Sequence, residues 1–334
     1  MKVVDFHCDT FSGFRHALLD DGVQKDLARN DMHIDLEKMR RGDYMLQCFA
    51  AFVFLGEKQD PTVVALEVMD QFFRAMEKYP DQIAQVKTWA DIERNRIEEK
   101  ISALLTIEES GSCHGEPELL RMFYRLGARI MSLTWNFENE IAWPNRIDMR
   151  TGECSPETEH GLKDKAYAFI DEMERLGMIV DVSHLSDAGF WDVARVAKRP
   201  FIATHSNARA VCGHVRNLTD EMLRAIADKG GLTGINYCPE FIDPNPDPKA
   251  RRSTVALMAR HIDHIRSVGG IDMIALGSDF DGIEPPLEMY DCSCLPMLEH
   301  ELHRGGFSDD EIEKIFHGNA LRLLKEFLPA GEAY

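Results

Sequence analysis

Six residues with the side chains of metal ligands or acid–base catalysts follow short apolar segments of this sequence. They are three histidines and three carboxylates: His7, Asp9, Glu108, His184, His205 and Asp279. Imidazole and carboxylate groups bind divalent ions such as zinc, and a carboxylate that is not a ligand can move protons. Because a buried, unpaired carboxylate is costly, such a cluster requires cations or raised pKa values. These residue types predict a metal centre with a catalytic base beside it.

The elements that position these side chains alternate along the whole chain. We expect eight strands, at residues 3–7, 46–54, 102–107, 128–134, 178–183, 201–204, 232–237 and 273–277. Helical spacing of apolar residues occurs between them, at residues 62–76, 118–126, 162–176, 221–227 and 255–268. Strands that alternate with helices are typical of a parallel sheet covered by helices.

Eight such strands favour an α/β fold of the (β/α)8 TIM-type barrel. A doubly wound sheet is the alternative, but the Gly-rich turn it needs after the first strand is missing, since Cys8 to Phe14 read CDTFSGF. We expect one barrel domain over residues 1–334, with a Pro-rich loop at 238–252. Active sites of such barrels lie at the carboxyl ends of the strands, where the six residues would meet.

Composition excludes several classes of partner. The 38 Lys and Arg stand against 57 Asp and Glu, and the net charge of -19 would repel a phosphate backbone, so no nucleic acid partner is expected. No apolar run reaches the ~20 residues of a membrane span, and the first ten residues lack an export signal. We therefore expect a cytoplasmic chain without a membrane partner, whose 8 cysteines are mostly buried. Cys292 and Cys294 leave a metal or redox pair as the alternative.

The motifs around these residues resemble those of the membrane (renal) dipeptidase family of the amidohydrolase superfamily. In order, they are His7-x-Asp9, Ile107-Glu108, Asp181-Val182-Ser183-His184, Thr204-His205-Ser206, Arg216-Asn217, Gly277-Ser278-Asp279-Phe280-Asp281-Gly282 and Gly318-Asn319-Ala320-Leu321. The resemblance therefore extends over nearly the whole chain.

This resemblance implies two Zn2+ ions per chain, although other divalent metals suit the same ligands. His7, Asp9 and Glu108 would hold one ion, and Glu108, as the bridge, would hold the second with His184 and His205. The implied reaction is hydrolysis of small dipeptides with a free C-terminal carboxylate, including L,D-dipeptides, by a metal-bound hydroxide. A homodimer is also implied.

Two further roles follow from the same resemblance. Asp279 matches the aspartate that handles the proton of the metal-bound water, and Arg216 matches the arginine that binds the substrate carboxylate. A planar guanidinium suits that task, because it pairs with a carboxylate through two parallel hydrogen bonds. The alternative for Arg216 is a surface ion pair with Asp220 or Glu221.

The sequence departs from the family's pattern at one position. Where founding members carry a histidine after Leu-Thr, this chain has Trp135 and Asn136. An indole can donate one hydrogen bond but cannot accept a proton. We expect Trp135 to be a wall of the substrate pocket, with Asn136 or Asn139 as possible replacements for the lost donor. His114 could also line the pocket, whereas the remaining histidines, among them His214 and His261, are expected at the surface or at helix caps.

Two other functions remain open on sequence alone. A different binuclear amidohydrolase could open a cyclic amide or deacylate an N-acyl amino acid, but many of those use a carboxylated lysine as the bridge. No Lys stands at the predicted strand ends, and Glu108 occupies the third. A catalytically silent binding protein is the other alternative, and only Trp135 favours it.

Overall fold

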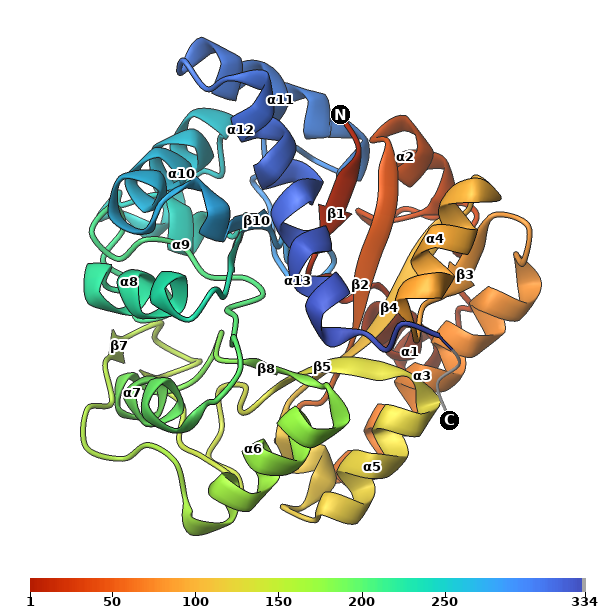
Figure 1. Cartoon of the computed structure of the whole chain (residues 1–334), viewed down its shortest axis with the longest axis vertical. Helices are drawn as coiled ribbons and strands as arrows, with labels where there is room; N and C mark the ends of the chain where they lie inside the picture. The colour runs from red at the N-terminus through yellow and green to blue at the C-terminus, as the bar shows by residue number, and fades with distance from the viewer. Residues whose placement is uncertain (332–334) are drawn as a thin grey trace.

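The computed structural model describes residues 1–331 and contains a parallel sheet that curls into a barrel, with helices around it (Figure 1). Its strand order is β8-β5-β4-β2-β1-β10-β9. The strands are β1 (Val3–Asp5), β2 (Tyr44–Phe52), β4 (Ile101–Glu108), β5 (Ala128–Ser132), β8 (Ile179–Asp181), β9 (Thr233–Ile235) and β10 (Ile274–Leu276). All neighbouring pairs are parallel, which confirms the predicted TIM-type fold.

The predicted strand at residues 201–204 is wrong in detail, because this segment joins the sheet only through single bridges. Ile202 bridges Asp181 of β8, and Ala203 bridges Thr233 of β9. The backbone approaches β9 and β10 closely here, since a Cβ on Gly234 or Gly277 would collide with the carbonyl oxygen of Thr204. The segment still connects the two outermost strands and completes the ring.

The interior of the barrel is filled at the end where the strands begin. One apolar side chain comes from each of the eight segments: Val4, Leu46, Leu104, Ile130, Ile179, Ile202, Leu232 and Ala275. Helix α13 (Asn319–Phe327) packs Leu323 and Phe327 against this layer and crosses that end of the barrel in Figure 1. The Asn319 amide donates to the carbonyl oxygens of Ile271 and Ile274, both at 2.8 Å. Because this end is packed, only the carboxyl ends of the strands are left for a site.

All five predicted helices are present, with ends shifted by a few residues. They are α3 (Pro61–Lys78), α5 (Pro117–Leu126), α6 (Asp164–Leu176), α8 (Asp220–Asp228) and α10 (Val255–Gly269). The others are α1 (Thr10–Asp21), α2 (Leu36–Arg41), α4 (Trp89–Ile97), α7 (Asp187–Val196), α9 (Pro239–Ile242), α11 (Leu295–Arg304) and α12 (Asp309–Glu313). No helix within residues 1–331 is long and apolar enough to cross a membrane.

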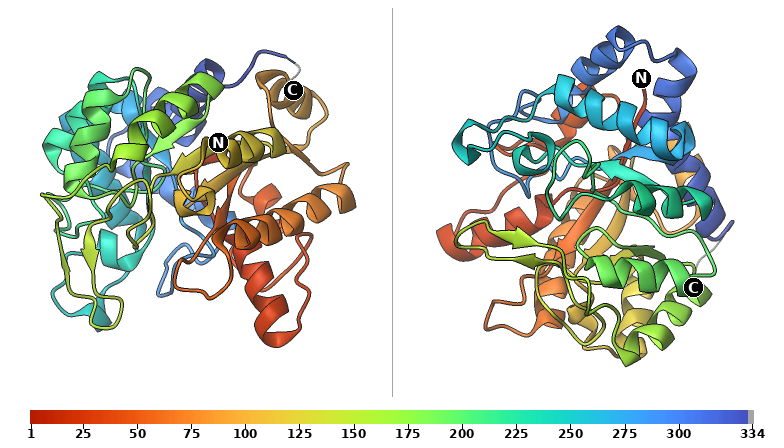
Figure 2. Two further views of the ribbon diagram at one scale, coloured as in Figure 1. Left: turned by 90° about the horizontal axis from the view of Figure 1, so that it is seen from below. Right: turned by 90° about the vertical axis from the view of Figure 1, so that its left-hand side faces the viewer.

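Three short strands were not predicted from the sequence. β3 (Ile83–Gln85) pairs with the first residues of β4, outside the main path of the sheet. β6 (Arg146–Ile147) and β7 (Cys154–Ser155) form a small antiparallel hairpin. This hairpin, the Pro-rich loop and α1 project from the same side of the barrel in the left view of Figure 2. Within the Pro-rich loop, Pro239–Ile242 forms α9 and Pro248–Ala250 forms a 3-10 turn.

Candidate active site

A cavity of about 880 Å³ opens at the carboxyl ends of the strands. Its walls include residues of the β6-β7 hairpin, the Pro-rich loop and the segment after β10. Seven of the nine predicted site residues line it: Asp9, Glu108, Trp135, Asn136, His184, Arg216 and Asp279. The other two, His7 and His205, are almost fully buried in contact with Glu108. The structure therefore brings all nine predicted residues to one place.

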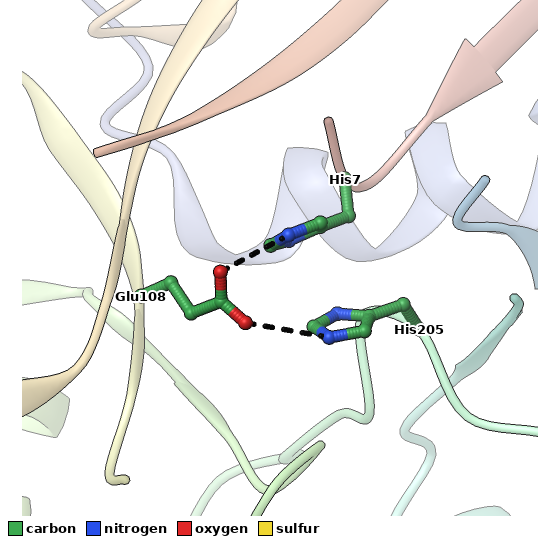
Figure 3. Close-up of side chains that lie close together, drawn as sticks. All are labelled: His7, Glu108 and His205. Carbon is green, nitrogen blue, oxygen red and sulfur yellow. Dashed lines mark ion pairs between the residues drawn. The ribbon is translucent and has the colours of Figure 1, made fainter. Parts of the chain in front are cut away.

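Glu108, the last residue of β4, stands at the centre of this cluster (Figure 3). One of its carboxylate oxygens, Oε2, lies 3.4 Å from Nε2 of His7. The other, Oε1, lies 2.9 Å from Nε2 of His184 and 3.5 Å from Nε2 of His205. The two oxygens therefore face two different groups of imidazole nitrogens, as a carboxylate that bridges two positive charges would.

A second group of ligand atoms lies on the His7 side. Nε2 of His7 is 3.4 Å from Oδ2 of Asp9 and 3.9 Å from Oδ1 of Asp279. Alternation along β1 would turn His7 away from the barrel axis, since Val4 and Phe6 already belong to the inner layer. The chain bends at Phe6, directly after β1 ends, and this bend allows His7 to reach the centre. The predicted meeting of His7 and Asp9 is thus observed, but strict alternation does not produce it.

The donor set suits divalent cations. Nε2 of His7 and Oδ1 of Asp9 are buried and have no hydrogen-bond partner among residues 1–331. Unsatisfied buried polar atoms of this kind are rare in proteins and point to a missing ion or water. Burial lowers the pKa of His7, but the Glu108 and Asp9 carboxylates outweigh it and hold that pKa well above its usual range. The carboxyl groups of Asp9, Glu108 and Asp279 thus surround one imidazole, and this set of oxygen and nitrogen atoms suits a divalent metal ion.

The two histidines on the other side are held in the form that a metal ligand requires. Burial, together with the positive charges of His7 and Arg216, keeps the pKa of both His184 and His205 well below its usual range, so both rings are neutral. Nδ1 of His184 donates to Oδ1 of Asn136 at 3.0 Å. The lone pair of His184 is then on Nε2, the nitrogen that faces Glu108. The same holds for His205 if its Nδ1 also donates a hydrogen bond.

His205 has such an acceptor in a hydroxyl that sequence reasoning did not identify. Nδ1 of His205 lies 2.7 Å from Oγ1 of Thr204, and that hydroxyl donates to Oδ2 of Asp181 at 2.7 Å. Asp181 also accepts from the hydroxyls of Ser132 and Ser183. Such outer partners fix the orientation and tautomer of a ligating histidine.

Asp279 is placed by a residue that the sequence did not single out. Oδ2 of Asp279 accepts from the side-chain amide of Asn236 at 2.9 Å, and its backbone has a φ of 63°. Burial raises the pKa of Asp279 to about 7, and repulsion by Asp9 and Glu108 contributes while His7 opposes it. This buried carboxyl group therefore takes up a proton more readily than an exposed aspartate does.

Two further buried aspartates hold the segment that carries Asp279. Asp5 accepts from the backbone N–H groups of His7 at 3.1 Å and of Ser278 at 3.0 Å, which joins the ends of β1 and β10. Asp281 accepts from the Thr10 hydroxyl and from the backbone N–H of His33, both at 2.6 Å. The segment from Ser278 to Asp281 is thus fixed at both ends.

Arg216 is buried, which excludes the surface ion pair with Asp220 or Glu221 that was its alternative. Its guanidinium donates to the Ser183 carbonyl oxygen and, at 2.8 Å, to Nε2 of His184. Its Nε has no hydrogen-bond partner among residues 1–331. The side chain lines the cavity beside the histidine cluster.

Trp135 forms an aromatic wall of the cavity with Phe52, Phe54 and Phe137, whose ring centroids lie 4.9 to 5.9 Å from its own. Asn139 is wrong as a replacement donor, because its side chain is buried within its own loop. Its NH2 group already donates to the Glu109 carboxylate and to the carbonyl oxygen of Leu133, and its oxygen accepts from the backbone N–H groups of Ile141 and Ala142.

Glu109 anchors this wall and was not predicted. Its carboxylate accepts from the backbone N–H of Trp135 at 2.8 Å and from that of Gly111 at 2.6 Å. The Glu109 backbone has φ 104° and ψ 101°, a conformation that residues with a Cβ rarely adopt. Burial raises its pKa to about 7. The only signal in the sequence was the pair of adjacent glutamates at the end of a predicted strand.

Several other expectations have clear outcomes. His114 does not line the cavity and instead lies 3.3 Å from the Asp60 carboxylate. The expectation of a surface position is wrong for His261, which is fully buried, and for His214, which lines the cavity.

Cys292 and Cys294 are buried and unpaired, as are most of the other cysteines, so the alternative of a metal or redox pair at these two residues finds no support.

Comparisons with known proteins agree with this geometry. The sequence profile of the membrane dipeptidase family, peptidase family M19, matches residues 1–332. The dipeptidase aclJ of Aspergillus oryzae is 32% identical, and the alignment covers 87% of this chain and 69% of that protein. An uncharacterized dipeptidase of Schizosaccharomyces pombe is 33% identical over 97% of this chain and 80% of its own length.

A solved structure shows the same fold over nearly the full length. A metallopeptidase from Rhodobacter sphaeroides, crystallised with a phosphinate mimic of the dipeptide L-Ala-D-Ala, superposes with a TM-score of 0.88. It is 25% identical, and the match covers 98% of this chain and 99% of that one. The family's use of metal agrees with the cluster of His7, Glu108 and His205. Because the profile covers almost every residue, this chain belongs to the membrane dipeptidase family M19 and is a metallo-dipeptidase of that family.

Proposed function

We propose that this chain is a binuclear zinc dipeptidase that hydrolyses dipeptides with a free C-terminal carboxylate, L,D-dipeptides included. The observation that carries the proposal is the position of Glu108, whose two oxygens face His7 on one side and His184 with His205 on the other. A single tetrahedral ion takes four ligands, whereas His7, Asp9, Glu108, His184 and His205 all bring ligand atoms here and Glu108 can contribute both of its oxygens.

His7, Asp9 and Glu108 would hold one ion, and Glu108, His184 and His205 the other. Imidazoles and carboxylates suit zinc, which prefers nitrogen and oxygen ligands of this kind. When bound, two divalent ions polarise the scissile carbonyl and bring the pKa of a coordinated water near 7. The buried atoms of His7 and Asp9 that lack partners support this assignment.

The protein's own residues then bind the substrate and move its proton. Asp279 takes a proton at its carboxylate and returns it to the leaving amine, and the Asn236 amide keeps the carboxylate oriented. Arg216 pairs with the C-terminal carboxylate, because its guanidinium is fixed beside the histidines and lines the cavity. Trp135 excludes water from one side of the peptide bond.

Two observations support a dipeptide with a D-residue over a cyclic amide. The Rhodobacter sphaeroides structure with 25% identity holds a mimic of L-Ala-D-Ala. In this chain, no lysine side chain lies among the residues that line the cavity next to Glu108, so a carboxylated lysine cannot be the bridge. The single lysine in the lining, Lys249, belongs to the exposed Pro-rich loop.

A panel of substrates assayed with added zinc tests the proposal. It contains L-Ala-L-Ala, L-Ala-D-Ala, the C-terminal amide of each, N-acetyl-alanine and a dihydropyrimidine as the cyclic amide. We expect hydrolysis of the free dipeptides and loss of activity with a chelator. Turnover of the acetylated amino acid or the cyclic amide, with the dipeptides untouched, would reject the proposed substrate class.

A further inference from the structure

One corner of the cavity contains two guanidinium groups that form no ion pair with a carboxylate. Arg216 and Arg251 both line the cavity, and no carboxylate oxygen of residues 1–331 lies within 4.0 Å of either guanidinium. The neighbouring Arg209, by contrast, pairs with both oxygens of Asp187, at 2.6 and 2.9 Å. In a chain of net charge -19, a cation that lines the substrate cavity without an acidic partner requires an explanation.

His214 shows that the two arginines belong to one corner. Its Nδ1 accepts from the backbone N–H of Arg216 at 3.1 Å, and its ring packs on Phe241 with 4.6 Å between centroids. Phe241 in turn lies 5.4 Å from the Arg216 guanidinium. Burial, together with the charges of Arg216, Arg251 and Arg209, lowers the pKa of His214 to about 4. All three charges that lower the pKa of His214 are guanidinium groups.

The Arg251 side chain is held in place but keeps its terminal nitrogens available. Its Nε donates to the carbonyl oxygen of Asn245 at 3.0 Å, within the same loop. Neither Nη atom makes a hydrogen bond with another residue of the described chain. The side chain is half-buried, so its charge is screened by solvent less than that of a fully exposed cation. An arginine in this state is ready to bind a carboxylate.

Acidic residues also line the cavity. Asp9, Glu108, Asp279 and Asp281 belong to the proposed metal site and the segment that supports it, where bound metal ions would offset their charge. Glu108 and Asp279 also attract Arg216.

Further acidic residues of the lining lie outside that site. Glu240 and Glu284 are exposed at the mouth of the cavity. Their charges are screened by water, whereas those of Arg216 and Arg251 are not fully hydrated. The inner corner therefore attracts anions even though the chain as a whole is acidic.

We propose that the preferred dipeptides end in an acidic residue, and that Arg251 binds its side-chain carboxylate while Arg216 binds its α-carboxylate. This inference rests on the proposed function, in which Arg216 holds the C-terminus of the substrate. One aspartyl or glutamyl residue at that end carries two carboxylates close together, and the corner offers two guanidiniums. A neutral residue of the same size leaves Arg251 without a partner.

The test compares acidic substrates with neutral ones of the same shape. L-Ala-D-Glu and L-Ala-D-Gln, with the L,L pair in parallel, are hydrolysed by the zinc-loaded wild type and by Arg251→Met, which keeps an apolar stem. Arg252→Met is the matched control, because Arg252 is on the same loop and does not line the cavity. Its guanidinium bonds only to carbonyl oxygens of that loop.

We expect the wild type to favour the glutamyl substrate by about 10- to 100-fold in kcat/KM, the range of a hydrogen-bonded charge pair. In Arg251→Met the kcat/KM for the glutamyl substrate falls, so that the ratio of the two kcat/KM values comes to within about threefold of one. Arg252→Met keeps the wild-type ratio. Equal hydrolysis of both substrates by the wild type, or a preference that survives in Arg251→Met, overturns the inference alone. Failure to hydrolyse any dipeptide overturns the proposed function and this inference with it.

Discussion

The side-chain oxygen of Asn136 lies 3.0 Å from Nδ1 of His184, on the loop that also carries Trp135. Because the oxygen can only accept, Nδ1 carries the hydrogen and Nε2 presents its lone pair to Glu108, 2.9 Å away. One amide therefore sets both the orientation and the tautomer of a proposed ligand. The residue that follows the unusual tryptophan thus has a structural connection to the metal centre.

Replacing Asn136 by Ala should weaken metal binding by about 10- to 100-fold, the usual effect of losing a partner that orients a ligating histidine. Competition with a chromophoric chelator measures this affinity. Asn136→Asp is the control, because a carboxylate oxygen can accept the same hydrogen bond and should restore most of the affinity. Equal metal affinity in wild type and Asn136→Ala would show that the bond does not orient His184.

Replacing Asp279 by Asn should lower kcat by about 10²- to 10⁴-fold, because the amide cannot take a proton. Metal content, measured by elemental analysis, should stay at the wild-type value, since Asp279 is not one of the proposed ligands. The amide can still accept the hydrogen bond from Asn236, so the fold of the segment is preserved. Full activity in this variant would reject the proton-transfer role.

Replacing Arg216 by Met should raise KM for dipeptides by about 10- to 100-fold, since a charge-assisted pair with the α-carboxylate is lost. Dipeptide amides provide the internal control, because they lack that carboxylate and should react equally poorly with both proteins. Arg216 also contacts His184, so metal content is measured in parallel. An unchanged KM, together with unchanged discrimination against the amide, would exclude the carboxylate role.

The stability of the protein should depend on the protonation of His261. Burial lowers the pKa of this residue from 6.5 to about 4; the charges of Arg260 and His264 contribute, and the hydrogen bond to the Ile242 carbonyl opposes the shift. The unfolded chain binds this proton below pH 6.5 while the folded chain does not. The contribution of neutral His261 to the free energy of unfolding is therefore complete above pH 6.5. It is lost as the pH falls toward 4, which lowers the free energy of unfolding by up to about 3 kcal/mol.

Denaturant unfolding at pH 7 and pH 4.5 measures this effect in wild type and in His261→Gln. The variant has no group that titrates at this position, so its loss of stability at low pH should be smaller. Release of metal at low pH affects both proteins and cancels in the comparison. Equal losses in the two proteins would show that His261 does not control this dependence.

Much of the fold followed from the sequence because the inner strands are short apolar runs and the covering helices repeat apolar residues at helical spacing. β3 was missed because it is three residues long and lies outside the main path of the sheet. His261 could have been recognised as buried, since it stands three residues after Met258 and four before Ile265 on the same face of α10.

The candidate ligands could be predicted because each lies at or just after the carboxyl end of an apolar segment of the barrel, but their supporting residues could not. Asn236, Thr204 and Glu109 act through hydrogen bonds to groups 43, 23 and 26 residues away in the sequence, respectively. Partners of that kind depend on the closure of the barrel and on loop conformations, neither of which leaves a periodic pattern. That Arg251 lines the same cavity as Arg216 likewise becomes apparent only when the Pro-rich loop is folded.

The most direct test of a binuclear dipeptidase is the titration of the metal-free chain with zinc while the hydrolysis of L-Ala-D-Ala is followed. Glu108 has ligand atoms on both of its sides, so activity should rise until two equivalents of zinc per chain are bound and then remain constant. Full activity before any zinc is added, or a plateau at one equivalent, would contradict the account.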